Sequence, residues 1–223
     1  MSFDQLSARM RDDWDARARE NAKFYIVDSN HNWTEEDFYA SGHRTVAEEI
    51  LTDMENICQD KAPAEMRVLE IGCGAGRVTS ALAGLFGEVD AVDISPEMVA
   101  LARRACAAKP NVRIHNNNGV DLAVLPGAEL FDFAFSVCVF HHVPSREVIE
   151  NYVREVGRLL RPGALFKFEV QGDPRVVSAP LDTWLGVPFI PEQATAMAER
   201  SGFEPRYSAG AGQERFWHWF FKR

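Results

Sequence analysis

The chain has 223 residues, of which 46% are hydrophobic and 26% are charged, the balance of an ordinary globular protein. Its formal net charge of −9 argues against a nucleic-acid partner, because phosphate backbones are bound by clustered lysine and arginine. No run approaches the roughly 18 apolar residues of a membrane-spanning helix. The four cysteines show no CxxC spacing. We therefore expect reduced thiols, a cytoplasmic protein, no membrane partner and no metal site.

The first 45 residues differ in pattern from the rest of the chain. Asp4 to Lys23 is charged and predicts a helix with a four-residue apolar stripe. Aromatic residues then stand among polar ones without a clear period, and Thr45 to Cys58 again carries apolar residues on one helical face. We expect residues 1–45 to form an N-terminal helical cap or lid, and residues 46–223 to form the main domain.

From Arg67 onward, short β-rich runs alternate with helical runs, the pattern of a parallel sheet covered by helices on both faces. The expected strands are Val68–Ile71, Val89–Asp93, Val112–His115, Phe131–Cys138 and Leu165–Val170. Between them we expect helices over Arg77–Phe86, from Ser95-Pro96 onward and from Ser145 onward, with a turn at Arg161-Pro162-Gly163. The chain should end with a helix over Glu192–Ser201 and a hairpin of Phe203–Tyr207 with Arg215–Phe221.

The most informative stretch joins the first expected strand to its helix through Gly72, Gly74 and Gly76. Glycines at this place let the backbone approach a ligand closely. The spacing departs from the G-x-G-x-x-G fingerprint of dinucleotide-binding proteins, and the acidic Glu70 precedes the loop. A carboxylate there repels a pyrophosphate and attracts an ammonium group.

The second expected strand ends at Asp93, about 20 residues after the glycine loop, where a carboxylate can accept hydrogen bonds from both hydroxyls of a ribose. A ligand with a ribose, an amino group and no phosphate matches Asp93 and Glu70 together. S-adenosyl-L-methionine is such a ligand, and it is also a sulfonium cation.

Four successive segments resemble the motifs of class I S-adenosylmethionine-dependent methyltransferases, in the same order: Val68–Thr79, Val89–Met98, Phe131–Pro144 and Leu159–Phe166. The resemblance implies an α/β, Rossmann-like fold with a seven-stranded sheet whose last strand is antiparallel. It also implies S-adenosyl-L-methionine as cofactor, S-adenosyl-L-homocysteine as product, and methyl transfer as the reaction, but it does not identify the acceptor. We expect a monomer or a homodimer.

The same resemblance assigns cofactor contacts residue by residue. The methionine portion would be lined by Gly72, Cys73 and Gly74, and we expect Glu70, Gly76 and Ser136 to be further cofactor-binding residues. The ribose would be bound by Asp93, and the adenine by Ile94, Met98, Asn118, Gly119 and Val120.

Each of these positions also has a plain structural interpretation. The glycines could form a tight turn only, Glu70 could cap a helix or pair with an arginine, and Asp93 could begin a helix. Asn118 could serve turn geometry alone. The aromatic run Phe216–Phe221 is more typical of a core strand than of a ligand site. Cys73 and Cys138 are expected to be packing thiols.

The acceptor should meet the cofactor after the fourth strand, where the resemblance places residues that face the transferred methyl group. His141 and His142 follow that strand, so one of them is a candidate general base, the alternative being loop or packing residues. Tyr25, Trp33 and Trp184 are candidate acceptor contacts, together with Phe38 and Tyr39. Their aromatic character favours a small organic acceptor.

Two other functions remain open at this point. A non-catalytic module that binds S-adenosylmethionine would carry the same motifs without turnover. An NAD-linked oxidoreductase would require the third glycine that this loop lacks.

Overall fold

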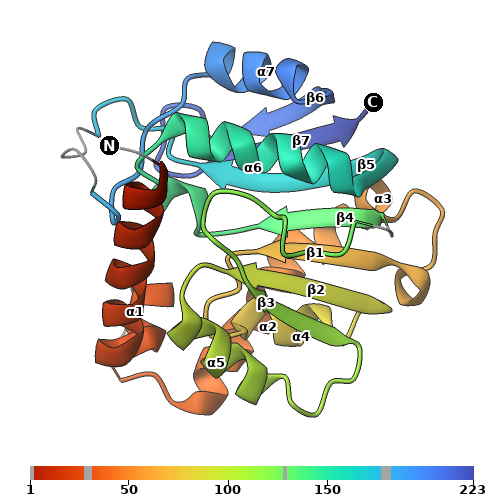
Figure 1. The fold of residues 1–223 in the computed structure, drawn as a ribbon. Helices are drawn as coiled ribbons and strands as arrows, with labels where there is room; N and C mark the ends of the chain where they lie inside the picture. Colours follow the sequence, from red (N-terminus) through yellow and green to blue (C-terminus); the bar gives the residue numbers. More distant parts are fainter. Residues whose placement is uncertain (1–2, 28–31, 128–129, 177–181) are drawn as a thin grey trace.

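The computed structural model describes residues 3–27, 32–127, 130–176 and 182–223. Within these residues, seven strands form one sheet in the order β3-β2-β1-β4-β5-β7-β6 (Figure 1). Strands β1 to β6 all run in the same direction, and β7 runs antiparallel to both of its neighbours, β5 and β6. This confirms the predicted Rossmann-like sheet with an antiparallel last strand. The strands are β1 (Arg67–Ile71), β2 (Glu88–Asp93), β3 (Val112–Asn116), β4 (Phe131–Ser136), β5 (Leu160–Val170), β6 (Phe203–Ala209) and β7 (Phe216–Lys222).

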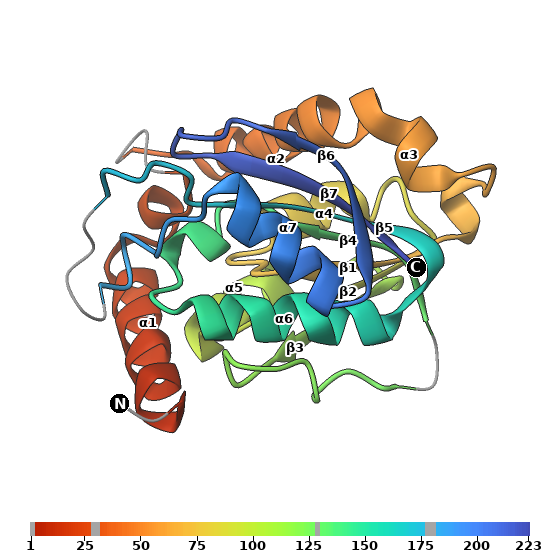
Figure 2. The ribbon, with the colours of Figure 1, turned by 90° about the horizontal axis from the view of Figure 1, so that it is seen from above.

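Helices cover both faces of the sheet, as predicted. Figure 2 shows α2 (Glu35–Glu49) and α3 (Met54–Cys58) on one side and α6 (Arg146–Leu159) on the other. Side chains alternate along a strand, so Val68 of β1 packs in the cluster with α2, α3 and α4, and Leu69 packs in the cluster with α6 and α7. The remaining helices are α4 (Arg77–Leu82), α5 (Pro96–Ala105), α7 (Pro191–Arg200) and the short 3-10 turns η1 (Leu51–Asp53), η2 (Pro63–Glu65) and η3 (Phe140–His142).

Several boundaries differ from the sequence prediction. The helix predicted over Thr45–Cys58 is broken: α2 begins ten residues earlier, capped by Thr34, and a 3-10 turn separates it from α3. Residue 45, the expected end of the cap segment, therefore lies inside a helix that packs on α4. The helix predicted over Arg77–Phe86 ends at Leu82, before a turn that contains two glycines.

Strands β4 and β5 also differ from the prediction. Strand β4 stops at Ser136, two residues early, because Cys138 has a left-handed φ of 58° that cannot continue a strand. Strand β5 begins at Leu160, so Arg161-Pro162-Gly163 lies within the strand rather than in a turn. Strand β7 behaves as the aromatic pattern predicts, since Phe216, His218 and Phe220 are buried.

Helix α1 (Phe3–Val27) lies at one end of the sheet in both views (Figures 1 and 2). The predicted helix over Asp4–Lys23 is thus confirmed, but Asn21 interrupts it with non-helical dihedral angles. The Asn21 side-chain oxygen accepts a hydrogen bond from the Phe24 amide at 3.2 Å, which starts a second short helical part. None of the described helices combines the length and the apolar character that crossing a bilayer requires.

Candidate active site

The glycine loop after β1 forms the floor of a pocket. Gly72, Gly74 and Gly76 all have positive φ, at 75°, 52° and 82°, a conformation that other residues adopt only at a cost. Gly72 also lacks space for a side chain, because a Cβ there would stand 2.2 Å from a methyl carbon of Val139. The loop therefore approaches the segment after β4 more closely than any other residue type would permit.

Asp93, at the end of β2, is tied to this loop. One carboxylate oxygen accepts from the Gly74 amide at 2.8 Å, and the other accepts from the Ser95 amide at 2.9 Å. Burial raises the pKa of Asp93 to about 6, and the two backbone amides oppose that rise. Each oxygen keeps a free lone pair, so the carboxylate can accept two further hydrogen bonds from a ligand.

Glu70, near the end of β1, is the second carboxylate of the pocket. Its side chain is buried and accepts a hydrogen bond from the Thr79 hydroxyl at 2.5 Å. Burial raises the pKa of Glu70 to about 7, although the Thr79 hydrogen bond and the charge of Arg77 favour its ionised form. The sequence alternative of an ion pair with an arginine is not seen, since no described arginine or lysine lies within 4 Å of it.

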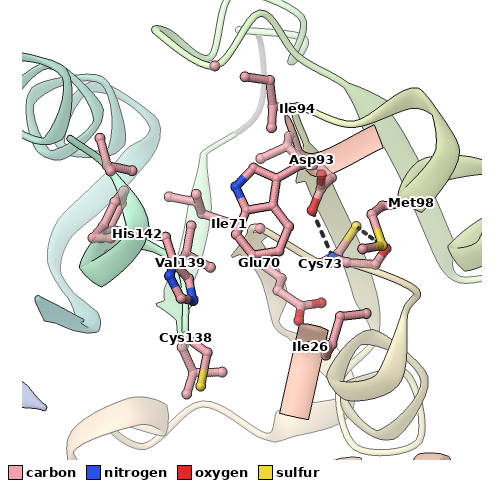
Figure 3. A pocket seen from close by; sticks show the side chains of 18 of the residues that line it. Ile26, Glu70, Ile71, Cys73, Asp93, Ile94, Met98, Cys138, Val139 and His142 are labelled. Carbon is pink, nitrogen blue, oxygen red and sulfur yellow. Dashed lines mark hydrogen bonds between the residues drawn. The ribbon is translucent and has the colours of Figure 1, made fainter. Parts of the chain in front are cut away.

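The pocket separates into two sides around Glu70. Figure 3 shows Asp93 and Met98 on one side and Cys138, Val139 and His142 on the other. The cavity contains about 940 Å³ of empty space, part of it open to solvent. Its walls include eight of the predicted cofactor residues: Glu70, Gly72, Cys73, Gly74, Asp93, Ile94, Met98 and Gly119.

Other predicted cofactor residues lie outside the pocket wall. The Asn118 side chain accepts from the amides of Val120 and Asp121, which is turn geometry. Its neighbour Asn117 lines the pocket instead. The Ser136 hydroxyl donates to the Ile71 carbonyl at 3.1 Å. Gly76 packs against Ala102 of α5. The cofactor roles of Asn118, Val120, Ser136 and Gly76 remain predictions.

Asn117 is a site residue that the sequence analysis missed by one position. Its amide nitrogen donates to the hydroxyl of Tyr152 at 2.6 Å, and its buried side-chain oxygen has no partner among the described residues. A buried polar atom without a partner is uncommon and marks a place for a ligand donor. Tyr152, on α6, also lines the pocket. Three consecutive asparagines give no signal of which one points inward.

Helix α1 supplies the outer wall of the pocket with Met10, Trp14, Tyr25 and Ile26. The interruption at Asn21 separates the first two of these residues from the last two. Tyr25 was predicted as an acceptor contact and lines the pocket. Trp14 was predicted only as part of an apolar stripe.

The other predicted acceptor contacts lie behind this wall. The Trp184 ring packs against Tyr25, at 5.7 Å between ring centroids, and against His142 at 5.0 Å. Trp33 packs against Phe38, which is fully buried in the core. Trp33 and Trp184 do not line the pocket, and their roles toward an acceptor remain predictions.

The two histidines form a hydrogen-bonded chain. His142 lines the pocket, and its Nδ1 lies 2.6 Å from the Trp184 carbonyl oxygen, which can only accept. Nδ1 therefore carries a proton. The Nε2 atoms of His141 and His142 are 2.9 Å apart. Burial lowers the pKa of His142 well below its usual value, and the neighbouring His141 lowers it further. A neutral His142 thus accepts from the Nε2–H of His141.

Glu169, on β5, lies beside this pair of histidines and was not singled out from the sequence. Its Oε1 lies 3.4 Å from Nδ1 of His141 and accepts from the Cys138 amide at 2.7 Å. Burial alone would raise the pKa of Glu169, but the contact with His141 and the charge of Arg215 lower it below its usual value. In His142, Nδ1 donates to the Trp184 carbonyl and Nε2 accepts from His141, so both ring nitrogens already have partners. It can take a proton from an acceptor only when its contact with His141 opens.

The cysteines of the pocket behave as packing thiols. Burial raises the pKa of Cys138 to about 11 and that of Cys73 well above its usual value. Both thiols stay protonated at neutral pH, so neither is an activated nucleophile.

Comparisons with known proteins agree with this geometry. Residues 68–163 match a family model described as a methyltransferase domain. The ubiquinone biosynthesis O-methyltransferase of Xanthomonas axonopodis pv. citri (strain 306) is 34% identical over 102 residues, which are 45% of this chain and 41% of that protein. The chain thus matches less than half of the length of this curated relative.

Two solved structures share the fold. The magnesium protoporphyrin IX methyltransferase ChlM of Synechocystis PCC 6803 with bound SAH superposes with a TM-score of 0.69 and 14% identity, over 98% of this chain and all of that one. A DhpI–SAH complex superposes with a TM-score of 0.63 and 21% identity, over 96% of both chains. Residues 68–163 thus match a methyltransferase-domain model, and the described chain shares the fold of solved methyltransferase structures with bound SAH.

Proposed function

We propose that the protein binds S-adenosyl-L-methionine and transfers its methyl group to a small organic acceptor. One observation carries the proposal. Asp93 is fixed by two backbone amides beside a left-handed glycine loop, and a second buried carboxylate, Glu70, stands in the same pocket. That pair matches the ribose hydroxyls and the ammonium group of the cofactor. The bound SAM and SAH of the structural neighbours support the same cofactor.

The residues present fit the cofactor at both ends. Gly72, Cys73 and Gly74 line the pocket beside Glu70, and the free oxygen of Asn117 offers an acceptor to an amino group such as that of adenine. Asp93 would hold the ribose, with Ile94 and Met98 as the apolar walls of the base. The cofactor supplies an electrophilic methyl group on a sulfonium.

The chain itself contributes orientation and exclusion of water. Holding two reactants in line at contact distance is worth about 7–11 kcal/mol of the barrier. Trp14, Tyr25 and Ile26 of α1 close the pocket over the loop after β4, which limits access of water. Among the residues of the pocket wall, His142 is the candidate general base. It becomes available to an acceptor proton when the contact between the two Nε2 atoms opens.

Isothermal titration calorimetry tests the cofactor assignment. We expect the protein to bind SAH at micromolar concentrations and not to bind NAD. Asp93→Asn should weaken SAH by about 10- to 100-fold, because a charge-assisted hydrogen bond contributes about 1.5–3 kcal/mol. Asp60→Asn, an exposed residue between α3 and β1, is the matched control and should bind as the natural chain does.

An Asp93→Asn variant that keeps full affinity for SAH, or a natural chain that prefers NAD, would refute the assignment. Transfer of a labelled methyl group from S-adenosylmethionine to a panel of small phenols, amines, thiols and carboxylic acids then tests catalysis. Binding of SAH without transfer to any member would favour the non-catalytic alternative.

A further inference from the structure

Asp15, on helix α1, carries a buried carboxylate whose hydrogen-bond donors belong to a distant part of the chain. Its exposed fraction is 9%. One oxygen, Oδ1, accepts from the Ser95 hydroxyl at 2.5 Å and from the Glu97 amide at 3.2 Å. These donors lie at the start of α5, 80 and 82 residues further along the chain. Burying a carboxylate is costly unless it is hydrogen-bonded, so these two bonds favour the position of α1 against α5.

Ser95 connects Asp15 to Asp93, the carboxylate proposed to bind the ribose. The Ser95 amide donates to the Asp93 carboxylate at 2.9 Å, and the Ser95 hydroxyl oxygen accepts from the Met98 amide at 3.1 Å. The second of these bonds caps α5. A hydroxyl has one proton to donate, and Ser95 gives it to Asp15. Asp15 therefore orients the side chain that begins α5 at the ribose end of the pocket.

The carboxylates of Asp15 and Asp93 also interact through their charges. Burial is the largest cause that raises the pKa of Asp93 to about 6, and the negative charge of Asp15 raises it further. Arg19, one turn after Asp15, lies 3.6 Å from the second Asp15 oxygen, but its side chain is exposed. The state of one carboxylate thus affects the other, both through Ser95 and through charge.

Asp15 is placed where α1 meets the pocket. The residue before it, Trp14, lines the pocket wall. Leu6 and Met10 pack in the hydrophobic core and hold the first turns of α1. The contact with Ser95 adds a directional, polar attachment beside Trp14, which apolar packing by itself does not supply.

We propose that Asp15 is a positioning residue that, through Ser95, holds α1 closed over the cofactor and keeps the start of α5 in its binding arrangement. The inference rests on the proposed function and deepens it, because it names a contact that determines how long the cofactor stays bound. Coupling between two such events is reciprocal. If the docked position of α1 favours the bound cofactor, the bound cofactor favours the docked position of α1.

Stopped-flow displacement of SAH tests the attachment. Asp15→Ala removes the acceptor of both hydrogen bonds and should raise the SAH dissociation rate by about 10-fold. Asp15→Asn keeps a side-chain oxygen that can accept from the same donors, so it should recover most of the slow dissociation. Asp12→Ala removes an exposed carboxylate of the same helix, paired with the adjacent Arg11, and should release SAH as the natural chain does. An Asp15→Ala protein that releases SAH as slowly as the natural chain overturns the proposal.

A double variant tests the path through Ser95. Ser95→Ala alone should raise the SAH dissociation rate, and Asp15→Ala/Ser95→Ala should raise it no further, because both substitutions remove the same contact. Effects that multiply in the double variant would show that the two residues act independently, and the proposal would fail.

Hydrogen–deuterium exchange tests the reciprocal effect and separates positioning from stability. In the natural chain, SAH should slow the exchange of α1 amides, and this slowing should be largely lost in Asp15→Ala. A lower Tm of Asp15→Ala, with unchanged SAH dissociation and unchanged protection of α1 by SAH, would assign Asp15 to the fold alone. Failure of the natural chain to bind SAH at all would instead refute the proposed function.

Discussion

At the scale of single residues, the site combines two carboxylates whose burial opposes their ionisation. Glu70 and Asp93 have pKa values of about 7 and 6 in the free protein. Their ionised forms are the ones that attract an ammonium group and accept from ribose hydroxyls. At neutral pH the free protein therefore keeps a substantial protonated fraction of Glu70, whereas Asp93 is mostly ionised, and a bound cofactor would favour ionisation of both.

This predicts a pH dependence of cofactor binding. Affinity for SAH should fall as pH decreases from 8 to 5.5, because protonation of Glu70 and then of Asp93 removes the charges that hold the ligand. Glu70→Gln keeps the shape of the side chain and should weaken SAH by about 10- to 100-fold at pH 8. Calorimetry across this pH range should show a flatter profile in the variant. An equally steep profile in both proteins would contradict the assignment of Glu70.

The same residue predicts a change of stability in the opposite direction. The folded pKa of Glu70 lies above its ordinary value of 4.5. Its contribution to stability is therefore fully present below pH 4.5 and is lost as the pH rises through about 7. A glutamine has no such loss. Thermal unfolding of free Glu70→Gln at pH 8 should thus show a Tm equal to or above that of the natural chain.

At the scale of elements, the glycine loop after β1 and the segment after β4 are in close contact, so each restricts the size of the residues that the other can carry. Gly72 faces Val139, and Cys138 keeps its left-handed conformation through its amide contact with Glu169. Strand β5 thus holds the segment that leads from β4 to the histidines of η3. The position of His142 on the pocket wall therefore depends on how β1, β4 and β5 are aligned in the sheet, and not on a local sequence motif.

Gly72→Ala tests this packing. Its Cβ would stand 2.2 Å from Val139 Cγ2, at a φ of +75°, so we expect a loss of about 2–4 kcal/mol in unfolding free energy from overpacking and backbone strain together. SAH binding should be lost as well. The double variant Gly72→Ala/Val139→Ala removes the two methyl carbons at 2.2 and 2.7 Å and leaves a contact of 3.0 Å with the Cβ of residue 139, so it should recover part of the stability; Val139→Ala alone is its control. A Gly72→Ala protein as stable as the natural chain would contradict the predicted close approach.

At the scale of the whole molecule, α1 is attached to two distant parts of the chain over the pocket. Asp15 accepts hydrogen bonds from the Ser95 hydroxyl at 2.5 Å and the Glu97 amide at 3.2 Å, at the start of α5. Arg17 donates to the Thr183 carbonyl at 3.1 Å and stacks over the Trp14 and Trp184 rings. Leu6 and Met10 of the same helix are buried in the core cluster that also contains residues of α6, so α1 is held over the pocket by apolar packing as well as by these polar contacts.

Removal of residues 1–27 tests this role. The truncated chain keeps α2 and the sheet, so it should fold by circular dichroism while its SAH dissociation rate rises at least tenfold, because four wall residues are missing. Methyl transfer should be lost. Stopped-flow displacement of SAH measures the rate, and Arg11→Ala, an exposed position on the same helix, is the control. Dissociation of SAH as slow as in the full chain would show that α1 does not retain the ligand in the pocket.

The sequence prediction agrees best with the structure where the pattern involves only a few adjacent residues. The glycines, the serine caps at Ser95 and Ser145, and the strand runs are read from a few adjacent residues, and the structure confirms the elements that they predict. The ends of β4 and β5 were misjudged because they depend on neighbouring strands. Asn117 was missed in favour of Asn118 because side-chain direction after β3 is set by its contact with Tyr152, 35 residues away.

The amino-acid sequence by itself determined the class of fold, the order of its elements and the acidic and glycine positions of the cofactor pocket. These features follow from short-range pattern and backbone chemistry. Only the tertiary structure brought Glu169 to the histidines, joined Asp15 to Ser95 and laid α1 across the opening. These contacts join residues far apart in the chain. They depend on the order of the strands in the sheet and on which buried polar groups find a partner in the folded protein.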